Sequence, residues 1–336
     1  MKKSTFAFIA IVILAALVYM ITQNQEAYIQ NRGYAHGTTY NVIYKHPQGV
    51  SIQPDLEKVM DSVDRSLSTY DSTSVISRIN RNEDTAPDDD FKKVFHTARR
   101  IAENTNGAFD ITVAPVVNAW GFGYTERSKV DSATIDSMMA FTGYTKVKLI
   151  NNRIKKEDPR LMLDVNAIAK GYSVDKTANY LESQGITNYM VEIGGEVRAR
   201  GTNNKGKPWR IGIDRPIDDP NATRRELKAV AALSDGALAT SGNYRRFYIK
   251  DGVKYSHTIN PKTGFPVRHS LLSASVYTNN CMTADAYATA FMVMGLEDSK
   301  ALVQNNPGLE AYFIYADKSG EEQVYATEGF KDLIRE

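Results

Sequence analysis

The sequence contains very little cysteine: Cys281 is the only one in 336 residues. A single cysteine can form neither an intrachain disulfide nor a thiolate metal cluster. The chain also lacks a basic surplus, because 41 Lys and Arg residues stand against 39 Asp and Glu residues, a formal net charge of +2. General nucleic-acid binders carry a clear excess of positive charge. Nucleic acid is therefore not an expected partner.

Several common catalytic templates are missing as well. No GxGxxG follows a strand pattern, no GK[ST] marks a Walker-type phosphate loop, and no GxSxG marks a hydrolase nucleophile. The sequence has no repeat of fixed period and no low-complexity tract. The most common nucleotide-binding and hydrolase folds are therefore not predicted.

One long hydrophobic run stands at the N-terminus. Residues 4–21 are uncharged and almost wholly apolar, and Lys2 and Lys3 precede them. As a helix this run spans about 27 Å, close to the hydrocarbon thickness of a bilayer. No small-residue cleavage site follows it, and no cysteine near position 20 offers a lipid anchor.

We therefore predict an uncleaved transmembrane anchor over residues 1–21, with a cleaved signal segment as the alternative, and a polar tether over residues 22–32. Positive residues stay on the cytoplasmic side of a membrane segment. With Lys2 and Lys3 inside, the expected location is the bacterial inner membrane, with the body of the protein facing the periplasm.

Residues 33–336 are predicted to form one large catalytic domain. Helical periodicity begins near Pro54, Phe91, Asn166 and Thr283. The strand-like segments are residues 37–44, 188–201, 209–214 and 271–278, a hairpin at 244–259 with Asp251-Gly252 as its turn, and two runs near the C-terminus. In the segment 188–201, Gly194-Gly195 indicates a bulge or a close backbone approach. The mixture predicts an α+β fold with mixed or antiparallel sheets and packed helices.

The stretch LDVNAIAKGYSVD (163–175) places Asp164 and Lys170 six residues apart across the expected start of a helix. Asn166 is a candidate cap, in which case both charges are simply solvated. The alternative is that the helix N-terminus, with its free N–H groups and positive dipole end, holds an anion. This stretch alone does not decide between a capped helix start with solvated charges and an anion-binding helix N-terminus.

Three further groups carry candidate chemistry. His257 enters the rigid loop HTINPKTGFP (257–266), either as a structural histidine or as a proton acceptor. Asp285 and Thr289 stand four residues apart on one helix face, where Asp285 either complements the helix dipole or joins the hydroxyl in a Mg²⁺ site. The aromatic group Tyr70, Phe109, Trp120 and Phe122 forms either core or a ligand platform.

Taken together, these segments resemble the ApbE family of FAD:protein FMN transferases from about Gly33 to Asp317. The matching segments are HGTTY (36–40), LSTYDSTSVISRIN (67–80), GAFDITVAPVVNAWGFG (107–123), LDVNAIAKGYSVD (163–175), VEIGGEVRARG (191–201), ALATSGNYRRF (237–247), HTINPKTGFP (257–266) and TADAYATAFMVMG (283–295). They occur in the order in which the family has them. The family commonly has Met where this chain has His36, and Gly or Ser where it has Asn166.

The resemblance implies a role for each matching position. The FAD contacts it implies are His36, Tyr70, Ala108, Phe109, Asp110, Asp164, Lys170 and Ile259. The Mg²⁺ site it implies consists of the carbonyl of Ala167 with Asp285 and Ala288 or Thr289. Asp285 is also placed in the catalytic centre, with His257 as the candidate proton acceptor.

The activity implied by the resemblance is Mg²⁺-dependent transfer of FMN from FAD to a threonine hydroxyl of an acceptor protein, with release of AMP. The alternatives are a Mg²⁺-dependent FAD pyrophosphatase and a flavin-binding protein without chemistry. The implied acceptors are subunits of membrane redox complexes such as the sodium-pumping NADH:quinone reductase and Rnf. The local look-alike DGALAT (235–240) has Leu238 where the acceptor pattern requires Ser or Thr, so self-modification is not expected.

Overall fold

The structure of the chain is a computed structural model. It describes residues 27–123, 131–217, 226–243, 247–250 and 253–335. The expected anchor over residues 1–21 and the expected Asp251-Gly252 turn lie outside the described residues. Within the described ranges, no helix is both long and apolar enough to cross a membrane.

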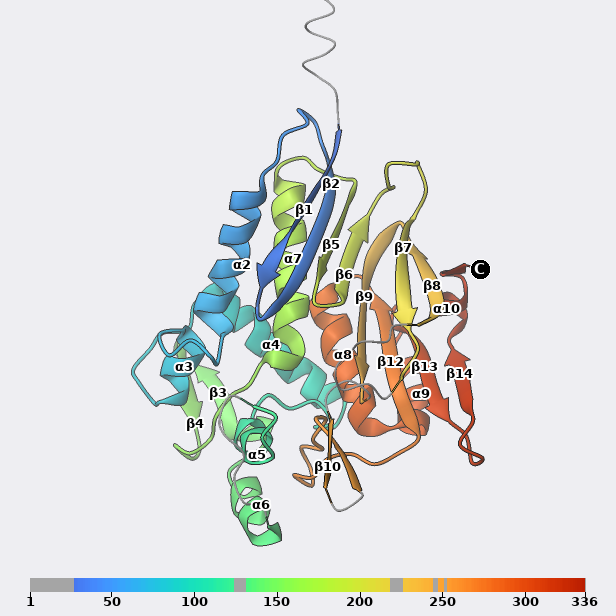
Figure 1. Ribbon diagram of the computed structural model, residues 1–336. Coiled ribbons are helices and arrows are strands. Elements are labelled where there is room, and N and C mark those ends of the chain that lie inside the picture. The colour runs from blue at the N-terminus through green and yellow to red at the C-terminus, as the bar shows by residue number, and fades with distance from the viewer. Residues whose placement is uncertain (1–26, 124–130, 218–225, 244–246, 251–252, 336) are drawn as a thin grey trace, which may run out of the picture.

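An antiparallel sheet of eight strands forms the middle of the molecule (Figure 1). In spatial order its strands are β1 (Ala27–Ala35), β2 (Thr38–His46), β5 (Tyr189–Ile193), β6 (Glu196–Arg200), β9 (Asp235–Gly242), β12 (Leu271–Thr278), β13 (Glu310–Ala316) and β14 (Glu322–Ala326). Each neighbouring pair is antiparallel. The predicted α+β class is confirmed, and the main sheet takes the antiparallel alternative.

The first strand begins earlier than the sequence predicts. Residues 27–32, which we expected in the tether, pair with residues 41–46 of β2. They resemble a tether because β1 is an edge strand, where polar side chains are tolerated. The side chain of Asn31 is nevertheless buried, and its Oδ1 accepts a hydrogen bond of 2.8 Å from the hydroxyl of Tyr44.

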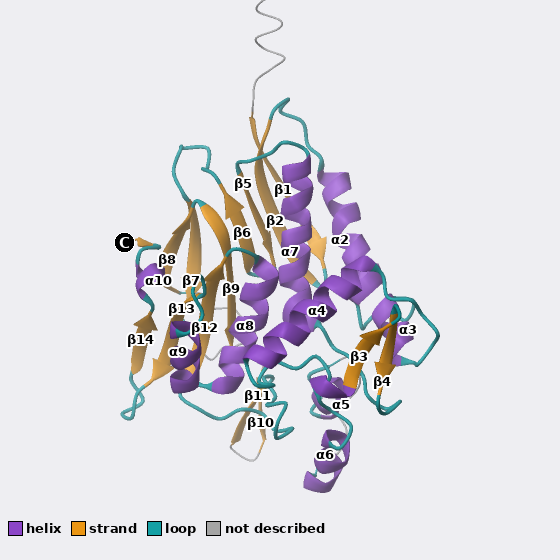
Figure 2. Cartoon of the chain, turned by 180° about the vertical axis from the view of Figure 1, so that it is seen from behind, coloured by secondary structure: helices purple, strands orange, loops and turns teal. Residues whose placement is uncertain are grey.

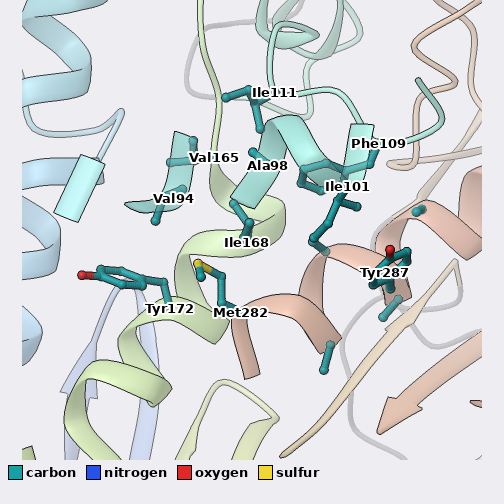
Figure 3. Packing of buried hydrophobic residues seen from close by; sticks show 14 of the residues in the cluster. Val94, Ala98, Ile101, Phe109, Ile111, Val165, Ile168, Tyr172, Met282 and Tyr287 are labelled. Carbon is teal, nitrogen blue, oxygen red and sulfur yellow. The ribbon is translucent and has the colours of Figure 1, made fainter. Parts of the chain in front are cut away.

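Four helices cover one face of this sheet (Figure 2). They are α2 (Gln53–Leu67), α4 (Asp89–Asn104), α7 (Asn166–Ser183) and α8 (Cys281–Met294). The apolar face predicted for the second of them is buried as expected, and Figure 3 shows its Val94, Ala98 and Ile101 packing near Ile168 of α7 and Met282 of α8. The last helix begins two residues before the predicted Thr283, because the side chain of Asn280 caps it by accepting the Thr283 N–H.

A smaller sheet packs on the opposite face of the main sheet. Its strands are β7 (Trp209–Asp214), β8 (Leu227–Leu233) and β15 (Ile334–Arg335). Trp209, Ile211 and Leu233 of this sheet share a buried cluster with Leu238 and Ile314 of the main sheet. The central strands are therefore covered on both faces, which explains why β12 is buried almost throughout.

The remaining elements are short and lie around these layers. They are α3 (Val75–Asn80), α5 (Ala114–Ala119), α6 (Ser132–Met139), the 3₁₀ turn Tyr144–Lys146, β3 (Val147–Ile150), β4 (Arg153–Lys156), β10 (Phe247–Lys250), β11 (Val253–Ser256), α9 (Leu296–Gln304) and α10 (Glu328–Lys331). Of the two alternatives predicted at Gly194-Gly195, the bulge is wrong, because these residues form the two-residue turn between β5 and β6. The close backbone approach is confirmed, because a Cβ on Gly194 would lie 2.8 Å from Cγ2 of Thr38. Both glycines have positive φ, 63° and 101°, as tight hairpin turns require.

Candidate active site

A cavity of about 410 Å³ lies where the first turns of α7, one face of α8 and the β5–β6 turn meet. It collects most of the residues that the sequence singles out. Those that line it are Ala108, Phe109, Asp110, Asp164, Ala167, Lys170, His257, Ile259, Asp285 and Thr289. Three other hollows of about 310, 400 and 550 Å³ contain none of the predicted residues. We therefore take this cavity as the candidate active site.

Gly171 marks the point where α7 crosses α8. A Cβ atom at this position would lie 2.4 Å from the carbonyl oxygen of Cys281 and 2.8 Å from the Cβ of Asp285, so only glycine fits. The close approach allows the Gly171 N–H to donate to Oδ2 of Asp285 at 2.9 Å. Asp285 is buried, and this burial raises the pKa of its carboxyl group. The dipole reading of Asp285 does not hold, because the first turn of α8 contains no acidic residue.

Lys170, one residue earlier, brings a positive charge to the same cavity. Its Nζ donates to Oε1 of Glu196 at 2.6 Å. Burial by itself lowers the pKa of Lys170, but the negative charges of Glu196 and Asp285 outweigh it and the pKa is raised. Burial raises the pKa of Glu196 as well. Lys170, Glu196 and Asp285 thus form one cluster at the cavity, with one ammonium and two buried carboxyl groups.

The start of α7 differs from the prediction that Asn166 caps this helix. Asn166 is the first helical residue and not the cap; its own N–H donates to Oδ1 of Asp164 at 2.7 Å. The N–H of Asp164 donates to the carbonyl of Ile111 at 2.7 Å, which ties this helix start to the 108–111 loop. The positive end of the α7 dipole therefore lies at the cavity, with one of its N–H groups already bound to a carboxylate.

The loop before α5 forms the apolar wall of the cavity. Ala108 and Phe109 are buried within it. The carboxyl group of Asp110 holds the loop in shape by accepting hydrogen bonds from the N–H and hydroxyl of Thr112 and from the N–H of Tyr144, at 2.7–2.8 Å. Burial raises the pKa of Asp110.

The segment 257–266 is held rigidly beside this wall. Ile259 pairs with Pro266 in an isolated β-bridge, and the indole N–H of Trp120 donates to the carbonyl of Gly264 at 2.8 Å. His257 is half-buried, lines the cavity, and meets the ring of Phe122 edge-on with centroids 6.4 Å apart. A histidine ring placed at a cavity wall in this way can take a proton from a bound hydroxyl.

The oxygen atoms on α8 and α7 suit a hard cation. Asp285 and Thr289 face the cavity from successive turns of α8, and Ala167 lines it from the first turn of α7. The hydroxyl of Thr289 lies 3.2 Å from that of Ser241. A carboxylate, a hydroxyl and a backbone carbonyl are the ligand types that Mg²⁺ accepts while keeping its waters. The described residues include no group of three or more His, Cys, Asp or Glu side chains that could hold a metal, so such a site depends on the hydroxyl and carbonyl oxygens.

Three predicted site residues lie elsewhere among the described residues. His36 joins the β1–β2 turn to two helices: its Nδ1 lies 2.7 Å from Oδ1 of Asp64, and its Nε2 lies 2.7 Å from the hydroxyl of Ser173. Tyr70 is 66% exposed and does not line the cavity. Ala288 is fully buried in the core, because a residue next to Thr289 points to a different side of the helix.

Glu196 and the end of β9 line the cavity although the sequence did not predict them as site residues. Glu196 lines the cavity directly after the Gly194-Gly195 turn, and Thr240, Ser241 and Gly242 line it from β9. The signal for Glu196 was present, since a carboxylate after two glycines in a buried hairpin is unusual. No local signal marks the end of β9, because its place beside α8 depends on the order of strands in the sheet.

The fold and the cavity together provide a binding site for a charged ligand. A buried carboxylate, a hydroxyl and a lysine meet there, at an antiparallel sheet backed by helices. The family model described as the ApbE family matches residues 36–313, and the chain belongs to this family.

Similar proteins cover nearly the whole chain. The FAD:protein FMN transferase of Vibrio cholerae is 37% identical over 334 residues, spanning 96% of this chain and 98% of that protein. The solved flavin transferase ApbE from Vibrio cholerae superposes with a TM-score of 0.83 at 38% identity, covering 92% of this chain and 100% of that one. The apo form of the Pseudomonas stutzeri flavinyl transferase ApbE gives a TM-score of 0.81 at 31% identity, with 92% and 97% covered.

Proposed function

We propose that this protein transfers FMN from FAD to a threonine hydroxyl of an acceptor protein and releases AMP, with Mg²⁺ bound at Asp285, Thr289 and the carbonyl of Ala167. Transfer of FMN from FAD to protein is the activity that the names of its relatives state. One observation carries the proposal: the cavity brings a lysine, a buried carboxylate, a hydroxyl and a histidine together from distant segments of the chain.

The proposed reaction is a phosphoryl transfer. The threonine oxygen forms a bond to the FMN-side phosphorus, and the bond from that phosphorus to the bridging oxygen breaks, so that AMP leaves with the electron pair. His257 takes the proton of the attacking hydroxyl. When bound, Mg²⁺ offsets negative charge on the diphosphate oxygens. Lys170 adds positive charge at the diphosphate end of FAD. Ala108 and Phe109 provide an apolar wall for the flavin ring.

The proposed acceptors are periplasmic parts of membrane redox complex subunits that carry a threonine flavinylation motif. The proposed location is the bacterial inner membrane, with the catalytic domain facing the periplasm. Both proposals rest on the family resemblance and on Lys2 and Lys3 before the apolar residues 4–21.

The test is a transfer assay with purified residues 27–336, FAD, Mg²⁺ and an acceptor domain that carries the motif. We expect FMN covalently bound to the motif threonine, detected by mass spectrometry of the acceptor, and AMP in equal amount. An acceptor with that threonine replaced by valine is the matched control and should stay unmodified. AMP with free FMN across several native acceptors would support the pyrophosphatase instead. Absence of AMP would leave only flavin binding.

A further inference from the structure

Glu196 is a buried acid that the proposed reaction leaves without a task. It is 4% exposed, and its Oε1 accepts the hydrogen bond from Lys170. Its second carboxylate oxygen, Oε2, is buried and has no hydrogen-bond partner in the described part of the chain. Buried polar atoms are nearly always hydrogen-bonded. The orphaned oxygen therefore indicates that the cluster is complete only when a bound molecule brings a donor.

The β5–β6 turn places this carboxylate against Lys170. A Cβ atom on Gly194 would lie 3.3 Å from Cδ of Lys170, so the aliphatic part of the lysine runs directly over the turn. Glu196 is the first residue of β6 after that turn. The β5–β6 hairpin therefore places the carboxylate of Glu196 next to the ammonium group of Lys170. Gly194 leaves room for the aliphatic part of the lysine side chain.

Lys170 has a second possible partner in the same cluster. The charge of Asp285 also attracts its ammonium group, yet Glu196 holds the hydrogen bond. Among the described residues, the N–H of Gly171 is the donor to Asp285, and it reaches Oδ2. Oδ1 of Asp285 receives no hydrogen bond from the described residues and stays available for a cation.

We propose that Glu196 is a positioning residue of the cation site: it keeps Lys170 paired so that Asp285 can bind a divalent cation, and its Oε2 accepts a hydrogen bond from a water carried by that cation. The proposal rests on the proposed Mg²⁺ site. One ammonium and two carboxylates give the cluster a net charge of −1 when all are ionised. Glu196→Gln removes one carboxylate, which leaves Asp285 as the counter-ion of Lys170 and in competition for the cation.

The test measures cation binding without turnover, by titrating the full-length protein in detergent micelles with Mn²⁺ and following the free Mn²⁺ signal by electron paramagnetic resonance. Loss of an outer partner of a metal site typically costs 10–100-fold in affinity. We expect the Kd for Mn²⁺ to rise about 10–100-fold in E196Q. Glu192→Gln is the matched control, because Glu192 lies on the same hairpin and accepts the N–H of Gly195 outside the cavity. Its Kd should match the wild type.

A second variant separates positioning from a structural role. In the double variant K170M/E196Q the competing ammonium is gone and the cluster charge returns to −1. We expect this variant to recover most of the affinity that E196Q loses. If the double variant binds Mn²⁺ as weakly as E196Q does, Glu196 does not act through Lys170, and the proposal is overturned.

The outcomes distinguish this inference from the function on which it rests. The proposed cation site is wrong if the wild type binds no Mn²⁺. It is also wrong if the wild type binds Mn²⁺ and the Asp285→Asn variant keeps that binding. If the wild type binds and E196Q stays within twofold of it, only the role of Glu196 is wrong. Thermal melting of each metal-free variant checks the fold. Should E196Q fail to fold, Glu196→Asp replaces it, with a threefold or larger rise in Kd expected and an unchanged Kd contradicting the proposal.

Discussion

A histidine in a loop is usually structural, and the chemical role proposed for His257 rests on the surroundings of its ring. Its ring is half-buried at the cavity wall, and Phe122 meets it edge-on. The β-bridge of Ile259 with Pro266 fixes the loop that carries it. A ring held in this way loses little freedom when a hydroxyl approaches, which is what a general base requires.

We expect His257→Ala to slow the chemical step of FMN transfer about 10²–10⁴-fold, the usual contribution of a general base. FAD binding should change little, because in the proposed complex Lys170 and the cation hold the diphosphate end. Single-turnover transfer, with flavin fluorescence for binding, measures the two effects separately. His96→Ala, at an exposed position on α4, is the control. A loss smaller than threefold would leave His257 as a structural residue.

At the scale of elements, α7 both lines the cavity and positions a second helix that lines it. Its first turn brings Asn166 and Ala167 to the cavity, and its second brings Lys170. Further along, the carboxyl group of Asp175 accepts the N–H groups of Cys281 and Met282 at 2.9 Å each, at the start of α8. The helix therefore both lines the cavity and fixes the start of the helix that carries Asp285.

Gly171→Ala tests how closely the two helices must cross. Alanine normally stabilises a helix interior by about 1 kcal/mol relative to glycine. Here the added Cβ would meet the backbone of Cys281 at 2.4 Å, so the helices must separate. We expect a loss of about 1–3 kcal/mol in the free energy of unfolding, as for overpacked cores, together with a large loss of cation-dependent turnover.

Gly185→Ala is the matched control for that variant. Gly185 stands just beyond the end of α7 with φ of 75° and no atom within 4 Å of an added Cβ. Its cost is conformational strain of about 1 kcal/mol, and turnover should stay normal. Denaturant unfolding and AMP release measure both properties. A Gly171→Ala protein as stable and active as the wild type would contradict the close crossing.

In the whole molecule, the start of β1 and the cavity lie toward opposite ends of the antiparallel sheet. Figure 1 shows β1 starting at the end of the sheet opposite α5 and β10. The cavity lies toward the second end, since Val117 of α5 and His257, just after β11, line it. If residues 1–21 anchor the protein as we propose, the cavity faces away from the membrane and toward an acceptor in the periplasm.

We expect the full-length protein in its native host to sediment with inner membranes and to need detergent for release. A protein comprising residues 27–336 should be soluble and should modify a soluble acceptor domain at the full-length rate, because β1 begins at Ala27 and keeps all its pairing. Membrane fractionation and transfer rates measure this. N-terminal sequencing that starts near Gln23 or later would reveal a cleaved signal and contradict the anchor.

The α+β class and the buried face of α4 follow from the sequence alone, as does a helix that starts near Asn166. Each depends on apolar spacing, turn glycines and helix starts, which are interactions between residues close in the chain. The family motifs likewise point to Lys170, Asp285 and His257, and the structure places all three at one cavity. Their roles there stay predictions.

Other features arise only when distant segments meet. The pairing of Lys170 with Glu196 depends on a hairpin turn folding back against α7. Asn166, which the sequence predicts as a cap, is the first residue of α7, and its N–H donates to the side chain of Asp164. The ring of the motif residue His36 pairs with Asp64 and Ser173, away from the cavity. A side chain takes whichever partner the packed fold brings within hydrogen-bond distance, and that choice is made by strand order and helix crossing, not by its neighbours in the chain.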